Sequence, residues 1–541
     1  MAPIALESEP SYLPLALALS HAAAVVYLSS KVGRSLYRAR RELGPAQDTR
    51  HRSAQRSNLT IVFASLAALG FVLAATSALS YLGLSYQTWA DERGVAVPKS
   101  PSELSFWGRD AAGTNATSLR LAYWLSDTPI HLDALEIVAE RARRLWWGQQ
   151  LDVATVSWMT LLAIEGRRRK IPHLWAYALL AHLVGLSFAQ NLFYVAMLLT
   201  PSPFSGTQSR LERLLNRALP PKPDNWWPKP VLFFVPLTLN YGAIISLPYA
   251  VGTASFPVTA VLARALTFAP LVLPAIVPES WGVVYPDPHG VYGTFNKLFQ
   301  FMSAAGLLMH AKATAVGLWH NMPEAYKHRH SIKIPFDTEK RSKWERSATA
   351  VEKVLGSMTD HPAVTGAGRD VLMCGLSLGL WAAVRAMDTG DMLQSIVPGY
   401  KAASGLQPTD PTQLPVKAES PAAEGQKQAS ASSSTALRRR ANLSVSSISS
   451  SNSPGDEGSQ TPKWRGRPRK VKAEPEPDPE DVPGDETYEP DADVRASATL
   501  GDVVPDDDFD WEAGSLAWAL TALGGLGTGS SAVFGAESIS R

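Results

Sequence analysis

The sequence predicts an all-α fold: a polytopic transmembrane helical bundle of about 8 to 9 spans, followed by a long disordered C-terminal tail. Three observations support this prediction. The apolar residues are gathered into uncharged runs of roughly 20 residues, the length that a helix needs to cross a bilayer. Bursts of Lys and Arg lie beside these runs. Finally, residues 388–512 are rich in Ser, Pro, Asp and Glu, a composition that cannot bury a core.

Three parts of the chain follow from these patterns. Residues 1–387 are expected to form the multi-span domain, and residues 388–512 the disordered tail. Residues 513–536 form a last apolar run that is rich in glycine and is expected to be a terminal helix. The chain has one cysteine, so an intrachain disulfide is excluded and a cysteine-based metal site is not expected.

The first two apolar runs set the predicted orientation. Residues 11–30 are followed directly by a basic stretch over residues 31–41, so the positive-inside rule places the N-terminus in the lumen. Residues 59–84 then return to the lumen. The lumenal stretch that follows, residues 85–144, contains "NAT" at Asn115, which is an N-glycosylation sequon.

The next runs extend the bundle. Residues 145–164 are expected to cross and to stop on the cytosolic side at the burst "GRRRK", after which residues 172–199 return to the lumen. Residues 230–278 are too long for one span and contain several prolines, which predicts two kinked or broken helices. A seventh run, residues 298–319, leads into a basic loop that is predicted to be cytosolic.

An eighth run decides the predicted side of the tail. The uncharged stretch between Asp370 and Arg385 is short, and it fits a buried or re-entrant segment about as well as a full span. We predict that it crosses, which places the tail and its sequon at Asn442 in the lumen. The eighth run and the terminal run both carry the GxxxG spacing of helices in close contact, so we expect these two runs to pack together.

Ionisable groups at bilayer depth are costly and mark functional sites by default. Asp152 lies inside the third run, and Asp133 and Glu136 precede it on one face of a predicted helix. Asp133 and Glu136 have no basic residue four positions further along the helix. Both are therefore free to point into a cavity in which Asp152 lies deeper. These three carboxyl groups are the candidate catalytic residues. The alternative is a structural ion pair between Asp152 and Arg264 or Lys312.

Aromatic and polar side chains near Asp152 complete a candidate substrate pocket. They are Trp146, Trp147, Trp158, His182, Gln190 and Asn191. Trp146 and Trp147 also fit an interfacial aromatic belt, whereas Trp158 lies near the middle of its run. A protonated carboxylic acid that faces aromatic walls can protonate an epoxide or alkene and guide a carbocation.

The segment "RRLWWGQQLDVATVSWMTLLAIEGRRRK", with "SYLPLALALSHA" near the N-terminus, is similar to polytopic membrane proteins of filamentous fungi. Some of these are membrane-bound terpene cyclases of the ascochlorin-pathway type. The resemblance implies an enzyme of the endoplasmic reticulum or contiguous nuclear envelope that acts on a hydrophobic epoxy-isoprenoid, without a metal or other cofactor. A non-catalytic membrane scaffold and a transporter-like protein remain open. The sequence motifs of serine hydrolases, zinc proteases and nucleotide-binding enzymes are absent.

Residues 463–470 of the tail, "KWRGRPRK", resemble an AT-hook. The resemblance implies contacts in the minor groove of A/T-rich DNA by the core of this motif, namely Arg465, Gly466, Arg467, Pro468 and Arg469. Acidic residues follow directly and would repel phosphate, and a lumenal tail never meets DNA. We therefore expect the bilayer to be a partner and DNA not to be one. A cytosolic tail would instead allow contact with chromatin from the inner nuclear membrane.

Overall fold

The computed structural model describes most of the chain except the long tail and several loops. The described residues are 10–42, 50–95, 104–105, 117–118, 120–200, 222, 226–285, 292–329, 337–400 and 509–539. The residues of the AT-hook-like motif and both sequons lie outside them.

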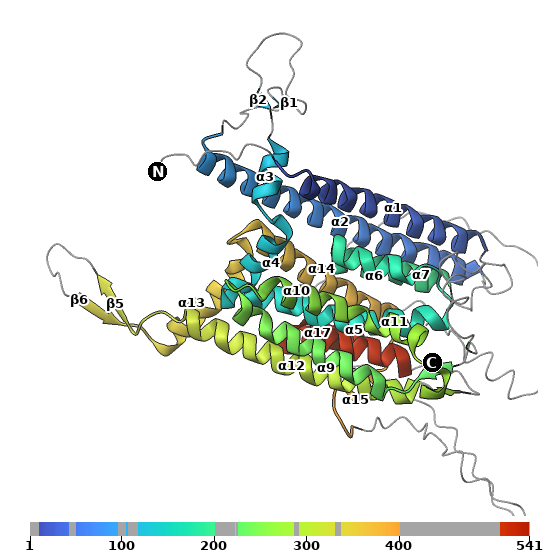
Figure 1. Cartoon of the computed structure of the whole chain (residues 1–541). Helices are drawn as coiled ribbons and strands as arrows, with labels where there is room; N and C mark the ends of the chain where they lie inside the picture. The colour runs from blue at the N-terminus through green and yellow to red at the C-terminus, as the bar shows by residue number, and fades with distance from the viewer. Residues whose placement is uncertain are drawn as a thin grey trace, which may run out of the picture. The chain divides into compact units, whose positions relative to one another are not determined.

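Helices make up nearly all of the described structure, which confirms the all-α prediction (Figure 1). The α-helices are α1 (Leu13–Glu42), α2 (Arg50–Arg93), α3 (Leu121–Asp127), α4 (Ile130–Glu140), α5 (Ala142–Arg168), α6 (Leu174–Leu183), α7 (Leu186–Leu199), α9 (Val231–Ala250), α10 (Phe256–Ala265), α11 (Ala269–Ile276), α12 (Tyr292–Asn321), α13 (Lys343–Gly356), α14 (Pro362–Val384), α15 (Thr389–Gln394) and α17 (Trp511–Ile539). Single 3-10 turns are η3 (Leu266–Phe268), η4 (Glu279–Trp281) and η6 (Ser357–Thr359).

The strands are short and form three separate pairs. These are β1 (Leu104–Ser105) with β2 (Thr117–Ser118) in parallel, β3 (Trp226–Pro228) with β4 (Gly282–Val284) antiparallel, and β5 (Tyr326–Arg329) with β6 (Asp337–Lys340) antiparallel.

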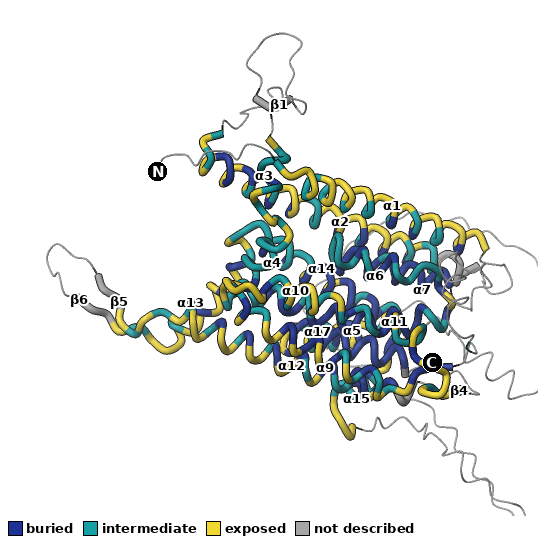
Figure 2. The backbone as a smooth tube through the Cα atoms, viewed as in Figure 1, coloured by how far each residue is buried: buried dark blue, intermediate teal, exposed yellow. Residues whose placement is uncertain are grey.

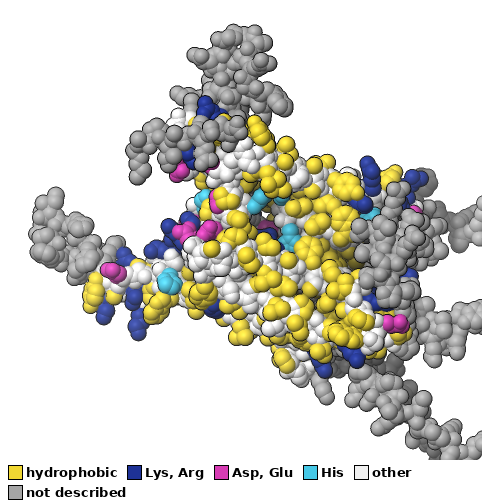
Figure 3. All heavy atoms as spheres, viewed as in Figure 1, with side chains coloured by type: hydrophobic (Ala, Val, Ile, Leu, Met, Phe, Trp, Pro, Cys, Tyr) yellow, Lys and Arg dark blue, Asp and Glu magenta, His cyan; other side chains and the backbone are white. Residues whose placement is uncertain are grey.

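The chain is an integral membrane protein. Six stretches are long and apolar enough to span a bilayer: α1, the part of α2 from Arg56, α9, the unit from α10 to α11, the part of α12 from Phe295, and α14. Their outward side chains are apolar and exposed, as Val26 at 70% and Leu308 at 71% illustrate. Figure 3 shows hydrophobic side chains over the middle of the visible face, with Lys and Arg gathered towards the ends. The buried core follows α5, α7 and α17 through the centre (Figure 2).

The helix ends lie on two sides of the bundle, which we name after arginines near the two ends of α5. On the Arg143 side, Arg143 Nε lies 2.8 Å from a carboxylate oxygen of Asp360, which precedes α14. On the Arg169 side, Arg169 Nη1 donates hydrogen bonds of 3.0 Å to the carbonyl oxygens of Met197 and Thr200, at the end of α7.

Within the described residues, seven elements run from one side to the other: α1, α2, α5, α9, the broken unit α10–η3–α11, α12 and α14. The N-terminal end of α1 lies on the Arg143 side, where Ser126 Oγ donates to the carbonyl of Ser11 at 2.8 Å. Helix α12 runs antiparallel to α5. Its Met302 sulfur accepts from Thr160, and further along Trp146 Nε1 donates to Thr314 Oγ1 at 2.9 Å.

The fourth apolar run does not cross, which makes the prediction for residues 172–199 wrong. Helices α6 and α7 contain 10 and 14 residues, about 15 and 21 Å of helix against a hydrocarbon core of about 30 Å. The chain reverses between them at Gly185. Tyr177 and Phe193, nearly equidistant from this turn, have ring centroids 5.8 Å apart. The run is therefore a re-entrant hairpin that enters and leaves on the Arg169 side.

The terminal run is a second re-entrant hairpin rather than the single helix predicted over residues 513–536. Its first half begins on the Arg169 side, where the amide of Asp510 donates to the carbonyl of Ala383 at 3.1 Å. At Gly525 the backbone has φ 79° and ψ 164°, and the chain reverses. The second half returns to the Arg169 side, where Glu537 lies 3.4 Å from Arg385.

The predicted contact between the eighth and the terminal runs is confirmed. The glycines of the two GxxxG patterns do not, however, face each other as the prediction implied. Trp518 Nε1 of α17 donates to the carbonyl of Gly375 at 3.1 Å, and the ring of Trp518 fills the space beside Gly379. Gly525 and Gly529 serve the hairpin itself, because Gly529 lies against Thr521 across the turn.

These hairpins change the predicted topology. Helix α14 has 23 residues and is long enough to span, as predicted for the eighth run. Because the fourth run does not cross, however, the described residues on both flanks of the tail lie on the Arg169 side. This is the side of the "GRRRK" burst, whereas the prediction placed tail and burst on opposite sides.

The structure also places the basic loop after the seventh run on a different side of the bundle from the one predicted. The hydroxyl of Ser357 donates to the carbonyl of Arg143 at 2.8 Å, so α13 and its flanks lie on the Arg143 side. Two basic segments that were both predicted to be cytosolic therefore lie on opposite sides. The described fold also continues beyond residue 387, because α15 packs on α17.

Candidate functional site

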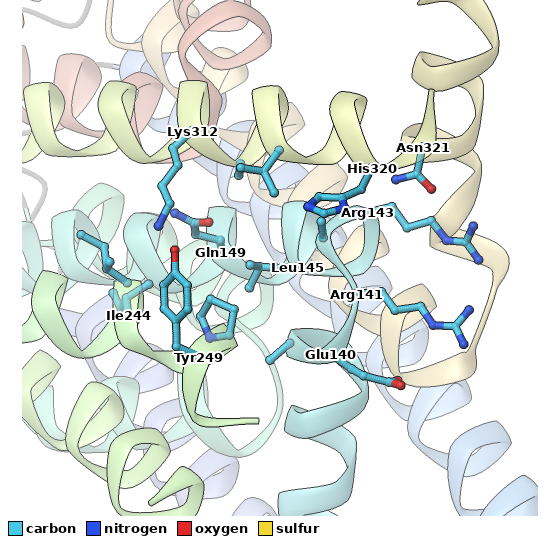
Figure 4. A pocket seen from close by; sticks show the side chains of 16 residues that line it. Glu140, Arg141, Arg143, Leu145, Gln149, Ile244, Tyr249, Lys312, His320 and Asn321 are labelled. Atoms are coloured by element: carbon cyan, nitrogen blue, oxygen red, sulfur yellow. The ribbon is translucent and has the colours of Figure 1, made fainter. Parts of the chain in front are cut away.

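A pocket of about 500 Å³ opens on the Arg143 side, between the α4–α5 junction, α9 and α12 (Figure 4). The chain is extended at Arg141, which ends α4 and starts α5. This break places Glu140, Arg141 and Arg143 at the mouth. The opposite wall comes from α9, where Pro248 lies inside the helix.

The mouth of this pocket carries more positive than negative charge. Three cationic side chains line it, Arg141, Arg143 and Lys312, against the single carboxylate of Glu140. Glu140 itself pairs with Arg144 at 3.4 Å. The amine of Lys312 points towards Tyr249 in Figure 4 and lies 5.1 Å from the centroid of that ring. The pocket is therefore suited to an anion.

Asp152 lies on the same face of α5 as two residues of the pocket wall. Leu145, Gln149 and Asp152 follow each other at spacings of four and three, so Asp152 is one turn further into the bundle than Gln149. The guanidinium of Arg264 on α10 acts electrostatically on Asp152. The ion pairs of the described residues do not include Asp152 with Arg264 or with Lys312. Arg264 thus influences Asp152 electrostatically without the tight ion pair that the sequence left open.

Histidines from three helices gather around the turn of the first hairpin. His182 Nε2 lies 2.9 Å from Thr267 Oγ1 in η3. His21 of α1 lies 3.1 Å from the carbonyl of Leu183, and its ring stacks on that of His131 at 5.3 Å. Burial lowers the pKa of His131, and the positive charges of His21 and Arg264 lower it further. Polar groups from α1, α4, α6 and α10 thus lie near this turn.

The turn of the second hairpin lies beside the inner end of the pocket. The amide of Leu526 donates to Gln150 Oε1 at 3.3 Å, and the ring of His310 lies against Gly525 and 5.6 Å from Trp146. A narrow cavity at this turn shares Gln149 and Ala313 with the pocket. The hairpin therefore forms part of the boundary between the pocket and the core.

The three predicted catalytic carboxyl groups do not line one common pocket among the described residues. Glu136 Oε1 accepts from the amide of Gly252 at 2.8 Å, and so ties α4 to the turn after α9. Burial and the nearby Glu136 raise the pKa of Asp133. Asp133 and Glu136 belong to α4, while Asp152 belongs to α5 inside the bundle.

The predicted pocket residues divide between packing and the two hairpin turns. Trp146 and His182 lie near the turns described above. Trp147 and Trp158 are 5% and 0% exposed, and Trp158 packs edge-on against a phenylalanine. Gln190 donates to the hydroxyl of Tyr194 at 3.0 Å, and Asn191 donates to a backbone carbonyl of its own helix. Four of these six residues therefore belong to the packed core and not to one of the described pockets.

Two buried charges that hold the hairpins were missed at the sequence level. The carboxylate of Asp370 accepts from the amides of Leu186 and Ser187, both at 2.8 Å, and caps the start of α7 inside the bundle. Arg169 was interpreted as a cytosolic stop signal, but its side chain is 3% exposed and also pairs with Glu165 at 3.1 Å. Asp370 marked only the edge of an apolar run, and nothing nearby in the sequence indicates its partner.

Comparisons with protein-family models, curated proteins and solved structures find no match to this chain. Within the described residues, no group of three or more His, Cys, Asp or Glu side chains is arranged to hold a metal ion. The functional conclusion therefore rests on the pocket, the intramembrane charges and the two hairpins.

Proposed function

We propose that this protein is a transporter-like integral membrane protein that admits a small anionic solute from the Arg143 side. One observation carries the proposal: the inner end of the pocket borders the turn of a re-entrant hairpin, and Asp152 lies one helical turn beyond Gln149, which lines both the pocket and the cavity at that turn. Broken helices and re-entrant segments are tolerated at membrane depth where they line a cavity or are buried in protein, and many transporters build their sites from them.

The charges support an anion as the solute. Asp360 balances the charge of Arg143, so Arg141 and Lys312 provide the excess positive charge at the mouth, which concentrates anions at the entrance. Lys312 is the cation nearest to the aromatic wall, over Tyr249. Asp152 then supplies the titratable group one turn deeper, where binding of a proton and binding of an anion would favour each other.

The opposite end of the bundle supports a state that is closed on the Arg169 side. Arg169 lies 3.9 Å from Glu537, at the base of the second hairpin, and bonds to the end of α7 at the base of the first. Passage of a solute would require the turn at Gly525 to move away from the pocket while these bases stay fixed.

The cyclase implied by the resemblance receives less support from this geometry. A cyclase needs one enclosed cavity that holds the acid and its aromatic walls. Trp158 is instead fully buried, and Asp133 and Glu136 lie on a different helix from Asp152. We therefore keep the terpene cyclase as the second candidate function. For either function, the proposed membrane is the endoplasmic reticulum or the nuclear envelope.

The AT-hook-like segment gains support from one observation. The described residues on both flanks of the tail, Arg385 and Asp510, lie on the same side as Arg169. One argument against DNA binding was that the tail is lumenal while the "GRRRK" burst is cytosolic. With both flanks of the tail on the side of this burst, that argument no longer applies. We propose minor-groove contact by Arg465 and Arg467 as a separate role, which chromatin retention lost in Arg467→Ala would test.

Cysteine accessibility tests the transporter proposal. Cys374 is the single cysteine and is buried, so Cys374→Ser gives a clean background. In proteoliposomes, a membrane-impermeant methanethiosulfonate should label Gln149→Cys and Asp152→Cys from the Arg143 side only. Ser157→Cys is the matched control on the same helix, because Ser157 is buried against Ser531 and should not react. Unreactive cysteines at both test positions in folded protein would refute an aqueous pathway.

A flux assay then separates the two functions. Proteoliposomes with a trapped pH-sensitive dye are exposed to external succinate as the probe anion. Proton-linked uptake should be lost in Asp152→Asn and weakened in Lys312→Gln, and retained in Arg40→Gln. Conversion of an epoxy-isoprenoid in microsomes, lost in Asp152→Asn without loss of protein, would establish the cyclase instead.

A further inference from the structure

A second cavity, of about 520 Å³, lies on the Arg169 side between α1 and the first hairpin. One wall is the C-terminal half of α1, and the other is formed by the two ends of the α6–α7 hairpin. It is separate from the proposed solute pathway, because its lining residues come from other elements than those of the first pocket.

The α1 wall is basic. Lys31, Arg34 and Arg38 follow each other at spacings of three and four, so they lie on one face of the helix, and all three line the cavity. The only carboxylate among the lining residues is Glu42. Three cations against one anion give this cavity a positive potential at the level where the helix leaves the membrane.

Lys31 is held in place above the cavity by aromatic rings. Its amine lies 5.3 Å from the ring centroid of Tyr27 and 5.4 Å from that of Trp175, and it donates to the Tyr27 hydroxyl at 3.2 Å. Trp175 belongs to α6, so this lysine bridges α1 and the hairpin. The cation is thus placed before any ligand arrives.

Part of the cavity lining is apolar, and one lining residue has an unsatisfied polar group. Leu36, Ile171 and Ala196 line it, and the hydroxyl of Tyr177 is buried with no hydrogen-bond partner among the described residues. Buried hydroxyl groups nearly always have a partner, so this one indicates a missing acceptor or donor. Beyond the cavity, the outer face of α1 is exposed, with Tyr37 at 66%.

We propose that this cavity binds an anionic phospholipid, with its phosphate between Arg34 and Arg38 and an acyl chain along the apolar face of α1. Guanidinium groups match phosphate oxygens in geometry and charge, and basic pockets between helices at a membrane surface recognise anionic headgroups. The lipid would add a further contact between α1 and the first hairpin.

The test measures lipid binding by the full chain in phosphatidylcholine nanodiscs that contain increasing amounts of phosphatidylserine. Arg34→Gln/Arg38→Gln should weaken the preference for phosphatidylserine by roughly 30-fold, which is about fivefold for each arginine. Arg40→Gln/Arg41→Gln is the matched control, since it removes the same charge from the next turn of α1 outside the cavity, and it should keep the preference.

Each outcome decides the proposal. Equal losses in both double variants would show a general surface attraction and overturn the site, as would an unchanged Arg34→Gln/Arg38→Gln. If inorganic phosphate or glycerol phosphate at millimolar concentration displaces the lipid completely, the site binds free phosphate and the lipid assignment fails. Melting in pure phosphatidylcholine shows that the variants fold, and Arg34→Lys/Arg38→Lys should recover part of the preference because the charge remains.

Discussion

Replacement of Gly525 by alanine should open the terminal hairpin. With φ 79° and ψ 164°, Gly525 occupies a backbone region that essentially only glycine adopts. A Cβ atom at this position would also lie 2.7 Å from Cγ and Nδ1 of His310. Neither problem can be relieved by a flexible side chain, because the neighbour is a ring packed beside Trp146.

The expected decrease in the free energy of unfolding is the sum of the backbone strain and the clash with His310. An alanine in this backbone conformation costs about 1–3 kcal/mol, and overpacking against a buried ring costs about 1–3 kcal/mol more. The sum, about 2–6 kcal/mol, is a large part of the stability of most folds. The matched control is Gly242→Ala in α9, where a Cβ meets nothing within 4 Å. There alanine should stabilise by about 0.5–1 kcal/mol.

The two variants are compared by thermal unfolding in the same detergent, in the Cys374→Ser background. We expect Gly525→Ala to melt well below the parent and Gly242→Ala at or above it. Thr521→Cys with Gly529→Cys should form a disulfide in the parent, because these residues touch across the turn. The crosslink should be weakened in Gly525→Ala. Equal melting of the two alanine variants, together with no crosslink in the parent, would refute the hairpin.

Three further predictions concern topology, the buried charges and pH. Asn115 and Asn442 are flanked by described residues on opposite sides, so at most one of the two sequons should carry a glycan; endoglycosidase-sensitive mass shifts at both would contradict the seven crossings. Glu537→Gln removes one carboxylate from the network that contains Arg169 and Arg385, and it should destabilise by about 1.5–3 kcal/mol. The exposed Glu512→Gln on the same helix should stay within about 0.5 kcal/mol, and similar melting of the two variants would argue against the buried network. Burial and a neighbouring aspartate raise the pKa of Asp391 to about 6. A raised carboxyl pKa stabilises the fold only while the group is protonated, so this contribution is complete below about pH 4 and is lost as the pH rises through about 6. The melting temperature of the parent relative to Asp391→Asn should therefore fall between about pH 4 and pH 6 and level off above that, and a constant difference would contradict the prediction.

The membrane fold could be predicted from the sequence because it depends on apolar run length. An apolar run of the right length predicts a span, and this holds for α1, α2 and α12. The same reasoning fails for residues 172–199, because two short helices joined at Gly185 contain as many apolar residues as one long helix. His182 and Ser187 near the middle of that run are the local signal of the turn.

The candidate site could be predicted only in part, because its contacts join distant segments. Asp152 was found as an intramembrane charge, but the approach of the terminal hairpin depends on the bond between Leu526 and Gln150, which are separated by 376 positions. The pocket mouth depends in the same way on Lys312 and Tyr249 of different helices. Periodicity and charge bursts describe each helix alone, so they do not indicate which helices face each other.

The buried charges on the Arg169 side connect the bases of the two hairpins through hydrogen bonds and ion pairs. Glu165 and Glu537 are 0% and 1% exposed. The desolvation free energy of such buried charges is usually about as large as the attraction between them. Apolar side chains could therefore fill the same space without loss of stability. What an apolar contact lacks is the fixed geometry by which Arg169 binds the end of α7 and approaches the end of α17 together. The hairpins are thus fixed at their bases and reverse at single glycines, so any movement that admits a solute should be largest at Gly185 and Gly525.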